Sequence, residues 1–132
     1  MIVIDSSALI AVLLAEPEHE AFKHALAESD ASVIGTANVL ESIQVALGKL
    51  GDSGRNRVET LIAENRIDVA PFDAAQLGHA IDAFMLFGRG RNHPAKLNFG
   101  DCMAYALAKS LDAPLLYKGD AFAQTDIRSA LP

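Results

Sequence analysis

The sequence contains a single cysteine and no apolar run close to the ~20 residues that a membrane-spanning helix needs. One cysteine excludes an intramolecular disulfide framework. The first ten residues lack the basic start of a secretory signal, so we expect a soluble, cytoplasmic protein with no membrane partner. Basic residues are also few: the net charge of -6 argues against loose electrostatic binding to nucleic acid but does not exclude a local basic patch.

The chain has 132 residues, of which 51% are hydrophobic. This is enough for one domain with a packed core, so we expect residues 1–132 to form a single domain that needs no structural metal. The charges are unevenly distributed. Residues 1–30 contain six acidic side chains and one lysine, whereas residues 89–118 contain five basic and two acidic side chains. An acidic protein with such a basic segment can still bind a polyanion at that segment.

The most informative stretch is residues 1–10, Met-Ile-Val-Ile-Asp-Ser-Ser-Ala-Leu-Ile. Its unbroken apolar run is typical of a parallel strand that helices cover on both faces, and we predict that it forms the central strand. Asp5 follows the run directly. At the carboxyl edge of an open α/β sheet, such a carboxylate is either part of a ligand site or the N-cap of the next helix.

Helical and strand patterns alternate along the rest of the chain. Pro17 opens one helix, Gly51 closes another, and Asn98 starts a further helix after a glycine-rich basic loop. This alternation predicts a parallel sheet between helical layers. We expect helices at residues 7–15, from 17 onward, at 36–50, up to 65, at 74–87 and at 99–111, and strands at 31–35, 67–71 and 115–117, with a short edge strand near Ile127.

Four carboxylates lie at the ends of these elements. Asp5 and Asp120 follow the first and fourth strands, while Glu41 and Asp101 are expected in the first turns of helices. Each has a structural explanation on its own. Glu41, three residues after an asparagine, fits a capping box. Asp101 would favour the positive end of its helix dipole, and Asp120 follows a turn glycine.

Their joint placement points to a common site. In a right-handed doubly wound sheet, Asp5 and Asp120 would emerge at the same edge, and helices that begin there would add their own acids. Carboxylates ~4 Å apart repel by about 4 kcal/mol per pair at an effective dielectric constant of ~20, so the cluster needs a cation. An all-oxygen site suits Mg²⁺ or Mn²⁺, which support in-line attack on phosphorus.

Other reactive side chains have simpler interpretations. No histidine is expected near the four acids, so the predicted site has no histidine base. Ser6 would act as a nucleophile only beside a base, and we expect it to hydrogen-bond a carboxylate, a metal-bound water or the start of its own helix. Cys102, which lies in an apolar helix, is interpreted as a core residue.

Four motifs, in this order, resemble one protein family. They are Ile-Val-Ile-Asp-Ser-Ser-Ala-Leu, Val-Leu-Glu-Ser, Leu-Asn-Phe-Gly-Asp-Cys-Met-Ala-Tyr-Ala-Leu-Ala and Leu-Leu-Tyr-Lys-Gly-Asp-Ala-Phe-Ala-Gln-Thr-Asp-Ile. Over nearly its whole length the chain closely resembles PIN-domain toxins of the VapC type. The resemblance implies a three-layer α/β/α sandwich with a central, mostly parallel sheet. It also implies magnesium-dependent ribonuclease activity, a homodimer and neutralisation by a cognate VapB-type antitoxin.

One position departs from the family pattern. Many relatives carry a second aspartate where this chain has Ala121. Its loss leaves fewer ligands for a second metal ion, so we expect one tightly held ion, and whether Asp126 compensates stays open. The acidic active-site set that the resemblance implies is Asp5, Glu41, Asp101 and Asp120, with Ser6 and Asp126 in support.

The chemistry of the acids and the resemblance together predict a mechanism. Asp5 and Asp101 would hold Mg²⁺, Asp120 would complete the site directly or through water, and Glu41 would orient or deprotonate the attacking water. By the resemblance, the cut would leave a 5′-phosphate and a 3′-hydroxyl. The expected contacts to the RNA backbone are Arg89, Arg91, Lys96 and Lys118; the alternative is a merely solvated loop.

Three competing interpretations stay open. A receiver-type phosphoacceptor domain has the same size and fold class but needs an aspartate at the end of the third strand, where Pro71 stands. A haloacid-dehalogenase phosphatase needs a second aspartate at the position of Ser7. A non-catalytic acidic metal-binding or protein-interaction module of receiver-like fold would follow if the acids only cap helices.

Overall fold

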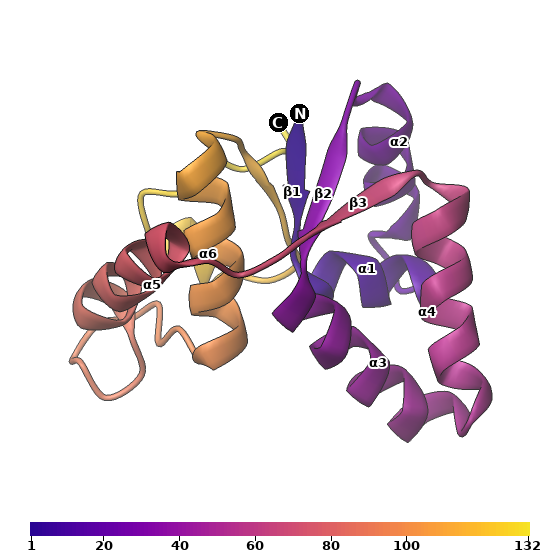
Figure 1. Ribbon diagram of the computed structural model, residues 1–132, viewed down its shortest axis with the longest axis horizontal. Helices are drawn as coiled ribbons and strands as arrows, with labels where there is room; N and C mark the ends of the chain where they lie inside the picture. The colour runs from indigo at the N-terminus through magenta and orange to yellow at the C-terminus, as the bar shows by residue number, and fades with distance from the viewer.

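A four-stranded parallel sheet forms the centre of the molecule. The computed structural model describes every residue from Met1 to Pro132. The strands lie in the order β3-β2-β1-β4, and helices cover both faces of the sheet (Figure 1). This confirms the predicted α/β fold, with β1 inside the sheet. The strands are β1 (Ile2–Ile4), β2 (Ser32–Gly35), β3 (Ile67–Ala70) and β4 (Leu115–Leu116).

Two helical layers enclose the sheet. α5 and α6 pack on one face and α1 to α4 on the other, as the left and right halves of Figure 1 show. None of these helices is long and apolar enough to cross a membrane. The helices are α1 (Ser6–Leu13), α2 (His19–Glu28), α3 (Thr36–Leu50), α4 (Ser53–Glu64), α5 (Ala74–Phe87) and α6 (Phe99–Leu111), followed by a short 3-10 helix (Phe122–Gln124).

Successive residues of β1 enter different apolar cores. Val3 packs among residues of α5 and α6, whereas Ile2 and Ile4 pack among residues of α1 to α4. All three side chains are buried. Side chains on a strand alternate between the two faces, and both faces of this sheet are covered. This is why the first strand is apolar at every position.

The parallel register brings the carboxyl ends of the strands to one edge of the sheet. β1 pairs with β2 on one side and β4 on the other, so that Val3 lies opposite both Val33 and Leu115. β1 and β2 lead almost directly into α1 and α3. The first turns of these helices therefore start at the edge where parallel α/β sheets commonly bind ligands.

Three helices have the predicted boundaries, but one residue was assigned to the wrong turn. α3, α5 and α6 begin and end where the sequence predicts. Because α3 starts at Thr36 with Gly35 as its N-cap, Glu41 stands in its second turn. The prediction of a first-turn position and a capping box for Glu41 is therefore wrong, and its carboxylate is not used to cap α3.

Other boundaries were predicted less accurately. The second helix begins at His19 rather than at Pro17, and α4 starts inside the expected turn. β4 is one residue shorter than predicted. The segment near Ile127 is not a regular strand and adds only a single bridge, between Leu115 and Ser129. The C-terminal tail thus bonds to β4 without extending the sheet.

Gly54 lies where α4 packs closely on α3. A Cβ atom at this residue would lie 2.5 Å from Ala46 C and 2.7 Å from Leu47 N, which are backbone atoms that cannot rotate away. Gly54→Ala should therefore lower the free energy of unfolding by about 1–3 kcal/mol, the usual cost of overpacking. In α5, Gly78→Ala adds a Cβ with no atom within 4 Å and should raise stability slightly. Urea unfolding of both variants tests this, and equal stabilities would contradict it.

Candidate active site

Asp5 ends β1 and caps α1. Its Oδ2 atom accepts hydrogen bonds from Ser7 N at 3.1 Å and from Ser7 Oγ at 2.5 Å, which satisfies a free amide at the start of the helix. Asp5 is only 3% exposed, and its Oδ1 atom is buried without a hydrogen-bond partner. The two interpretations of Asp5 are thus compatible, because one oxygen caps the helix while the other has no partner within the protein.

The electrostatic surroundings of Asp5 favour its neutral form. Burial is the main cause that raises the pKa of Asp5 to about 7; hydrogen bonds from Ser7 oppose the rise, and the charges of Asp101 and Glu41 add to it. Three acids from three different elements therefore share one environment. Near neutral pH the Asp5 carboxyl group lies between its protonated and charged forms.

Glu41 reaches the same region from α3. Its Oε1 atom accepts a short hydrogen bond from Ser6 Oγ and another of 3.3 Å from Asn38 Nδ2. Asn38 is fully buried, and its Nδ2 atom also donates to Gly100 O at 3.1 Å. The Oε2 atom of Glu41 accepts no hydrogen bond from the protein. One oxygen therefore fixes the Glu41 carboxylate, and Ser6 bonds a carboxylate as predicted.

Asp101 stands in the first turn of α6, as predicted. It forms a capping box with Asn98: Asp101 Oδ2 accepts from Asn98 N at 3.0 Å, and Asn98 Oδ1 accepts from Asp101 N at 2.9 Å. Burial raises the pKa of Asp101; the Asn98 amide opposes this rise, the charge of Glu41 adds to it and Arg89 opposes it. Asp101 takes part in the capping box of α6 and is also a member of the acidic group.

No hydrogen bond or ion pair links Asp120 to this group, and Asp126 is bonded to α6. Asp120 is exposed in the loop after β4, and its side chain makes no hydrogen bond or ion pair. Asp126 accepts from Tyr105 Oη at 2.8 Å and from Lys109 Nζ at 2.6 Å. Partial burial raises the pKa of Asp126, but these two donors bring it below its ordinary value. Asp126 ties the C-terminal tail to α6, and both of its carboxylate oxygens accept hydrogen bonds from that helix.

The donor atoms suit a divalent cation, although they do not form a finished metal site. No three histidine, cysteine or acidic side chains are grouped so that they could hold an ion. Asp5 Oδ1 is nonetheless a buried oxygen without a partner, and burial and neighbouring charges raise the pKa of Asp5. An all-oxygen donor set fits Mg²⁺ or Mn²⁺ rather than Zn²⁺. Asp5 and Asp101 are the residues that would hold such an ion.

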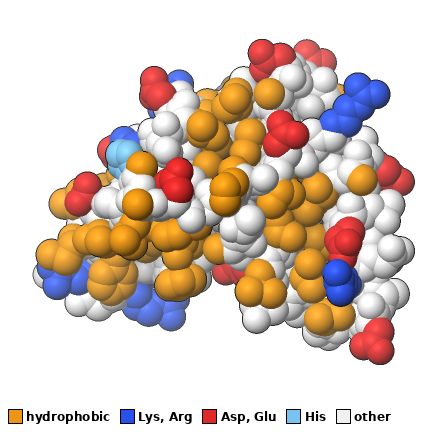
Figure 2. Space-filling view, viewed as in Figure 1, with side chains coloured by type: hydrophobic (Ala, Val, Ile, Leu, Met, Phe, Trp, Pro, Cys, Tyr) orange, Lys and Arg blue, Asp and Glu red, His pale blue; other side chains and the backbone are white.

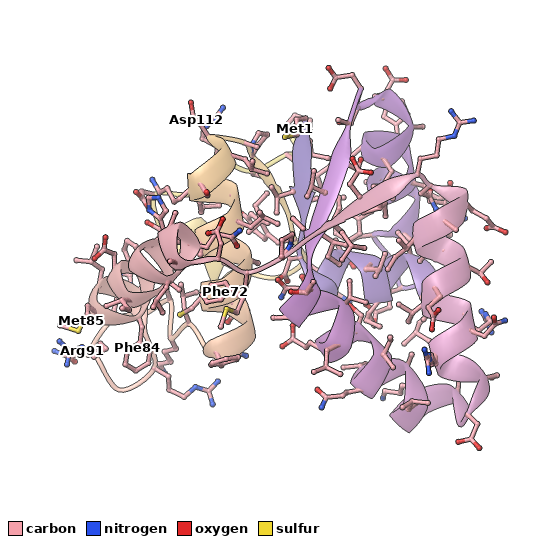
Figure 3. The ribbon with its side chains drawn as sticks, viewed as in Figure 1. Met1, Phe72, Phe84, Met85, Arg91 and Asp112 are labelled. Carbon is pink, nitrogen blue, oxygen red and sulfur yellow. The ribbon has the colours of Figure 1, made fainter.

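The basic loop before α6 lies beside the acids. Arg89 is close enough to Asp101 to favour its charged form. Arg89 and Lys96 line an open hollow of about 750 Å³. Arg91 Nε donates to Met85 O at 3.3 Å, and the two residues lie together at the end of α5 in Figure 3. All three basic side chains are exposed, and Arg89 is the one that acts on Asp101.

Lys118, the fourth expected RNA contact, has other partners. Its Nζ atom lies 2.9 Å from Glu16 Oε1 and 3.3 Å from Glu18 Oε2, and the hydrogen bond to Glu16 is the main cause that raises the pKa of Lys118. Its backbone amide donates to Ser7 Oγ at 2.9 Å. Because Ser7 also holds Asp5, the backbone of Lys118 supports the acidic group, while its ammonium group is paired with Glu16 and Glu18.

Three residues, Ser7, Asn38 and Gly100, have supporting roles that were not predicted from the sequence. The hydroxyl that bonds Asp5 belongs to Ser7, not Ser6. The separation of two residues matches an Asx turn, and this signal could have identified Ser7. Asn38 and Gly100 gave no such signal. Asn38 was interpreted as a helix cap, and its bond to Gly100 O joins α3 to α6, which lie far apart in the sequence.

The chain is similar in sequence to known proteins over nearly its whole length. A model of the PIN domain matches residues 2–128. A ribonuclease VapC from Mycolicibacterium smegmatis is 39% identical over 125 residues, which cover 95% of this chain and 96% of that protein. Such identity over whole chains indicates a shared fold and a shared set of structural positions.

Two solved structures show the same fold at low sequence identity. VapC20 from Mycobacterium tuberculosis, described as a sarcin-ricin loop cleaving toxin, has a TM-score of 0.79 at 13% identity, with full coverage of both chains. VapBC2 from Rickettsia felis, bound to a DNA fragment from its promoter, has a TM-score of 0.75 at 12% identity and covers 98% of this chain and 96% of that one. The three-layer architecture is therefore common to all three.

The raised pKa of Asp5 predicts how stability depends on pH in the metal-free protein. Between about pH 4 and pH 7 the unfolded chain loses a proton that the folded chain keeps, so stability should fall as pH rises through this window. Asp5→Asn should remove the part of this fall that comes from Asp5 and raise the free energy of unfolding at pH 8 by up to about 4 kcal/mol. Urea unfolding with a chelator tests this, with the exposed Asp52→Asn as the control. An unchanged pH profile in Asp5→Asn would contradict it.

Proposed function

The chain belongs to the PIN-domain family and to its VapC branch, and from this premise we propose that it is a magnesium-dependent endoribonuclease and the toxin of a toxin-antitoxin pair. Its reaction would be the hydrolysis of RNA phosphodiester bonds. The observation that carries the proposal is the buried Asp5 Oδ1 atom without a hydrogen-bond partner, in an environment shared with Asp101 and Glu41. Acids kept in such an environment are functional candidates, because the charged form needs a cation.

Each acid would have a distinct task. Asp5 and Asp101 would hold Mg²⁺ or Mn²⁺, and Asp120 would complete the site through water. A bound ion of this type lowers the pKa of a water and stabilises charge on a phosphate. Glu41 is fixed through Oε1, so its Oε2 atom would accept a hydrogen bond or a proton from the attacking water. Ser6 and Asn38 would keep that carboxylate in place.

The basic loop would bind the RNA backbone. Arg89, Arg91 and Lys96 are exposed, and Arg89 lies near enough to Asp101 to act on its charge. Contacts from such side chains to phosphates position a nucleic acid without reading its sequence. In a chain of net charge -6, this local cluster would determine where a polyanion can approach. Lys118 would not contribute, because its ammonium group is paired with Glu16 and Glu18.

Exposed apolar side chains support protein partners: a cognate VapB-type antitoxin and a second copy of the chain. Figure 2 shows hydrophobic side chains gathered over α5 on the left and between α3 and α4 on the right. Figure 3 labels Phe72, Phe84 and Met85 on the α5 side of the sheet. Patches of this kind on a small domain commonly mark interaction surfaces. The exposed apolar residues are Leu77, Ile81, Phe84, Met85, Leu86 and Phe99 on α5 and α6, and Leu40, Val45, Leu47 and Val69 near α3.

The receiver-type interpretation finds no support in the structure. β3 ends at Ala70, and the next acid, Asp73, caps α5 through a bond from Gln76 N to Asp73 Oδ1 at 2.8 Å. Asp73 is therefore not a phosphoacceptor at a strand end. The helix caps at Asp5 and Asp101 do not account for the whole of either carboxylate. Each cap uses only one oxygen, and the other takes no part in it.

Cleavage of total cellular RNA tests the proposed activity. With Mg²⁺ the purified protein should produce discrete fragments, and a chelator or Asp5→Asn should slow their formation by about 10²-fold or more, because electrostatic stabilisation at phosphorus is lost. Asp52→Asn removes one exposed carboxylate outside the acidic group and is the matched control. Equal cleavage by Asp5→Asn and the unsubstituted protein would remove the acidic group from the mechanism.

Binding of single-stranded RNA tests the role of the basic loop. In a chelator the RNA should stay intact, so fluorescence anisotropy reports binding alone. Arg89→Ala and Lys96→Ala should each weaken binding and reduce the salt dependence, with the slope of log K against log salt falling by about 0.7 for each phosphate that the variant no longer neutralises. Arg57→Ala removes an exposed charge from α4, in the other helical layer. If Arg57→Ala weakens binding as much as Arg89→Ala, the loop is not the RNA-binding segment.

A further inference from the structure

We infer that Asn38 and Gly100 are positioning residues that fix the Glu41 carboxylate between α3 and α6 for the reaction. Neither residue is expected to contact substrate. Asn38 would act through its side-chain amide, and Gly100 through the space left by its missing Cβ. This inference rests on the proposed ribonuclease function, in which Glu41 handles the attacking water.

The space at Gly100 is already occupied by Glu41. A Cβ atom built on Gly100 would lie 2.6 Å from Glu41 Cδ and 2.7 Å from Glu41 Oε1, well inside van der Waals contact. The carboxylate thus lies directly over the first turn of α6, one residue before Asp101. Any side chain at position 100 would push it away. The intruding atoms are the far end of a flexible side chain, so the displacement should leave the fold intact.

Asn38 links Glu41 to α6 by hydrogen bonds. From α3 its Nδ2 atom donates to Glu41 Oε1 at 3.3 Å and to Gly100 O at 3.1 Å. The backbone carbonyl of Asn38 accepts a hydrogen bond from Ser42 Oγ at 2.7 Å. The side chain is fully buried, and its Oδ1 atom has no hydrogen-bond partner. A buried side-chain amide with an unsatisfied oxygen lowers the stability of the fold. Its presence here points to a role for the Nδ2 atom, which donates to Glu41 and Gly100.

The two residues act on the carboxylate in complementary ways. Ser6 Oγ and Asn38 Nδ2 both donate to Oε1, which fixes the rotation of the carboxylate. Because Gly100 has no Cβ, the Glu41 carboxylate can approach the backbone of α6 next to the capping box of Asn98 and Asp101. Without either support, the Glu41 carboxylate would lose its defined place beside Asp101. The expected result is a slower chemical step with little change in RNA binding.

Steady-state kinetics on the metal-loaded protein test the inference. Gly100→Ala should lower kcat by about 10²-fold, the loss expected for a misplacement of ~1 Å, while KM changes by no more than about twofold. In a Glu41→Ala background, Gly100→Ala should have no further effect, because its target is gone. Gly48→Ala is the matched control: it adds the same methyl group to α3 with no atom within 4 Å. Unchanged kcat in Gly100→Ala, or an equal loss in the Glu41→Ala background, would overturn the inference.

Asn38→Leu provides a second variant of similar size. It removes the Nδ2 donor to Glu41 Oε1 and puts nothing in its place, so kcat should again fall with KM nearly constant. Asn38→Leu retaining full kcat would refute the role of the amide, whatever Gly100→Ala does.

A spectroscopic measurement separates this inference from the proposed function. The side-chain amide signals of Asn38 in a ¹H–¹⁵N spectrum should shift in both Glu41→Ala and Gly100→Ala and stay in place in Gly48→Ala. These shifts need no RNA cleavage. If they appear in a protein that cuts no RNA, the proposed function fails while the placement of Glu41 stands. If the chemical shifts of the Asn38 side-chain amide do not change in Gly100→Ala, the inference fails even in an active ribonuclease.

Discussion

Desolvation of the Asp5 carboxylate is the constraint on which the acidic group depends. β1 is covered by helices on both faces and flanked by β2 and β4, so a side chain at its end is almost fully removed from water. A buried carboxylate favours its neutral form unless hydrogen bonds or a cation stabilise the charge. Ser7 donates to one oxygen only, and the other has no partner. The fold therefore gives up stability at this point, as proteins do at functional sites.

The parallel topology of the sheet brings the other acids close to Asp5. Because the strands end at a common edge, α1 and α3 start beside each other, and α6 brings its first turn to the same place. Two adjacent serines then serve two different acids: Ser6 donates to Glu41, and Ser7 donates to Asp5. Ser7 itself accepts from Lys118 N, which links the end of β4 to the end of β1. The hydrogen bonds reach the acidic group from both sides of the central strand.

Local signals in the sequence predicted most of the fold and part of this group. The boundaries of α3 and α6 followed from apolar spacing together with Gly51, which has φ +71, and the cap residue Asn98. Asp5, Glu41, Asp101 and Asp120 were expected to gather because parallel topology brings the strand ends and the helix starts to one edge of the sheet. The first three act on one another's charge in the structure. The positions of Asp120 and Lys118 were not predictable in this way. The loop after β4 turns at Gly119, with φ +96, and the partners of Lys118 come from the segment after α1, far away in sequence.

If the acidic group binds a divalent cation as proposed, Asp5 must lose its proton on binding. Isothermal titration of the apo protein with Mg²⁺ or Mn²⁺ at pH 7, in two buffers with different ionisation enthalpies, measures this directly. With a pKa of about 7 for Asp5, binding should release about half a proton per ion at pH 7 and almost none at pH 9. No proton release should accompany any residual binding by Asp5→Asn. Binding without proton release at pH 7 in the unsubstituted protein, or no binding at all, would contradict a metal site at Asp5.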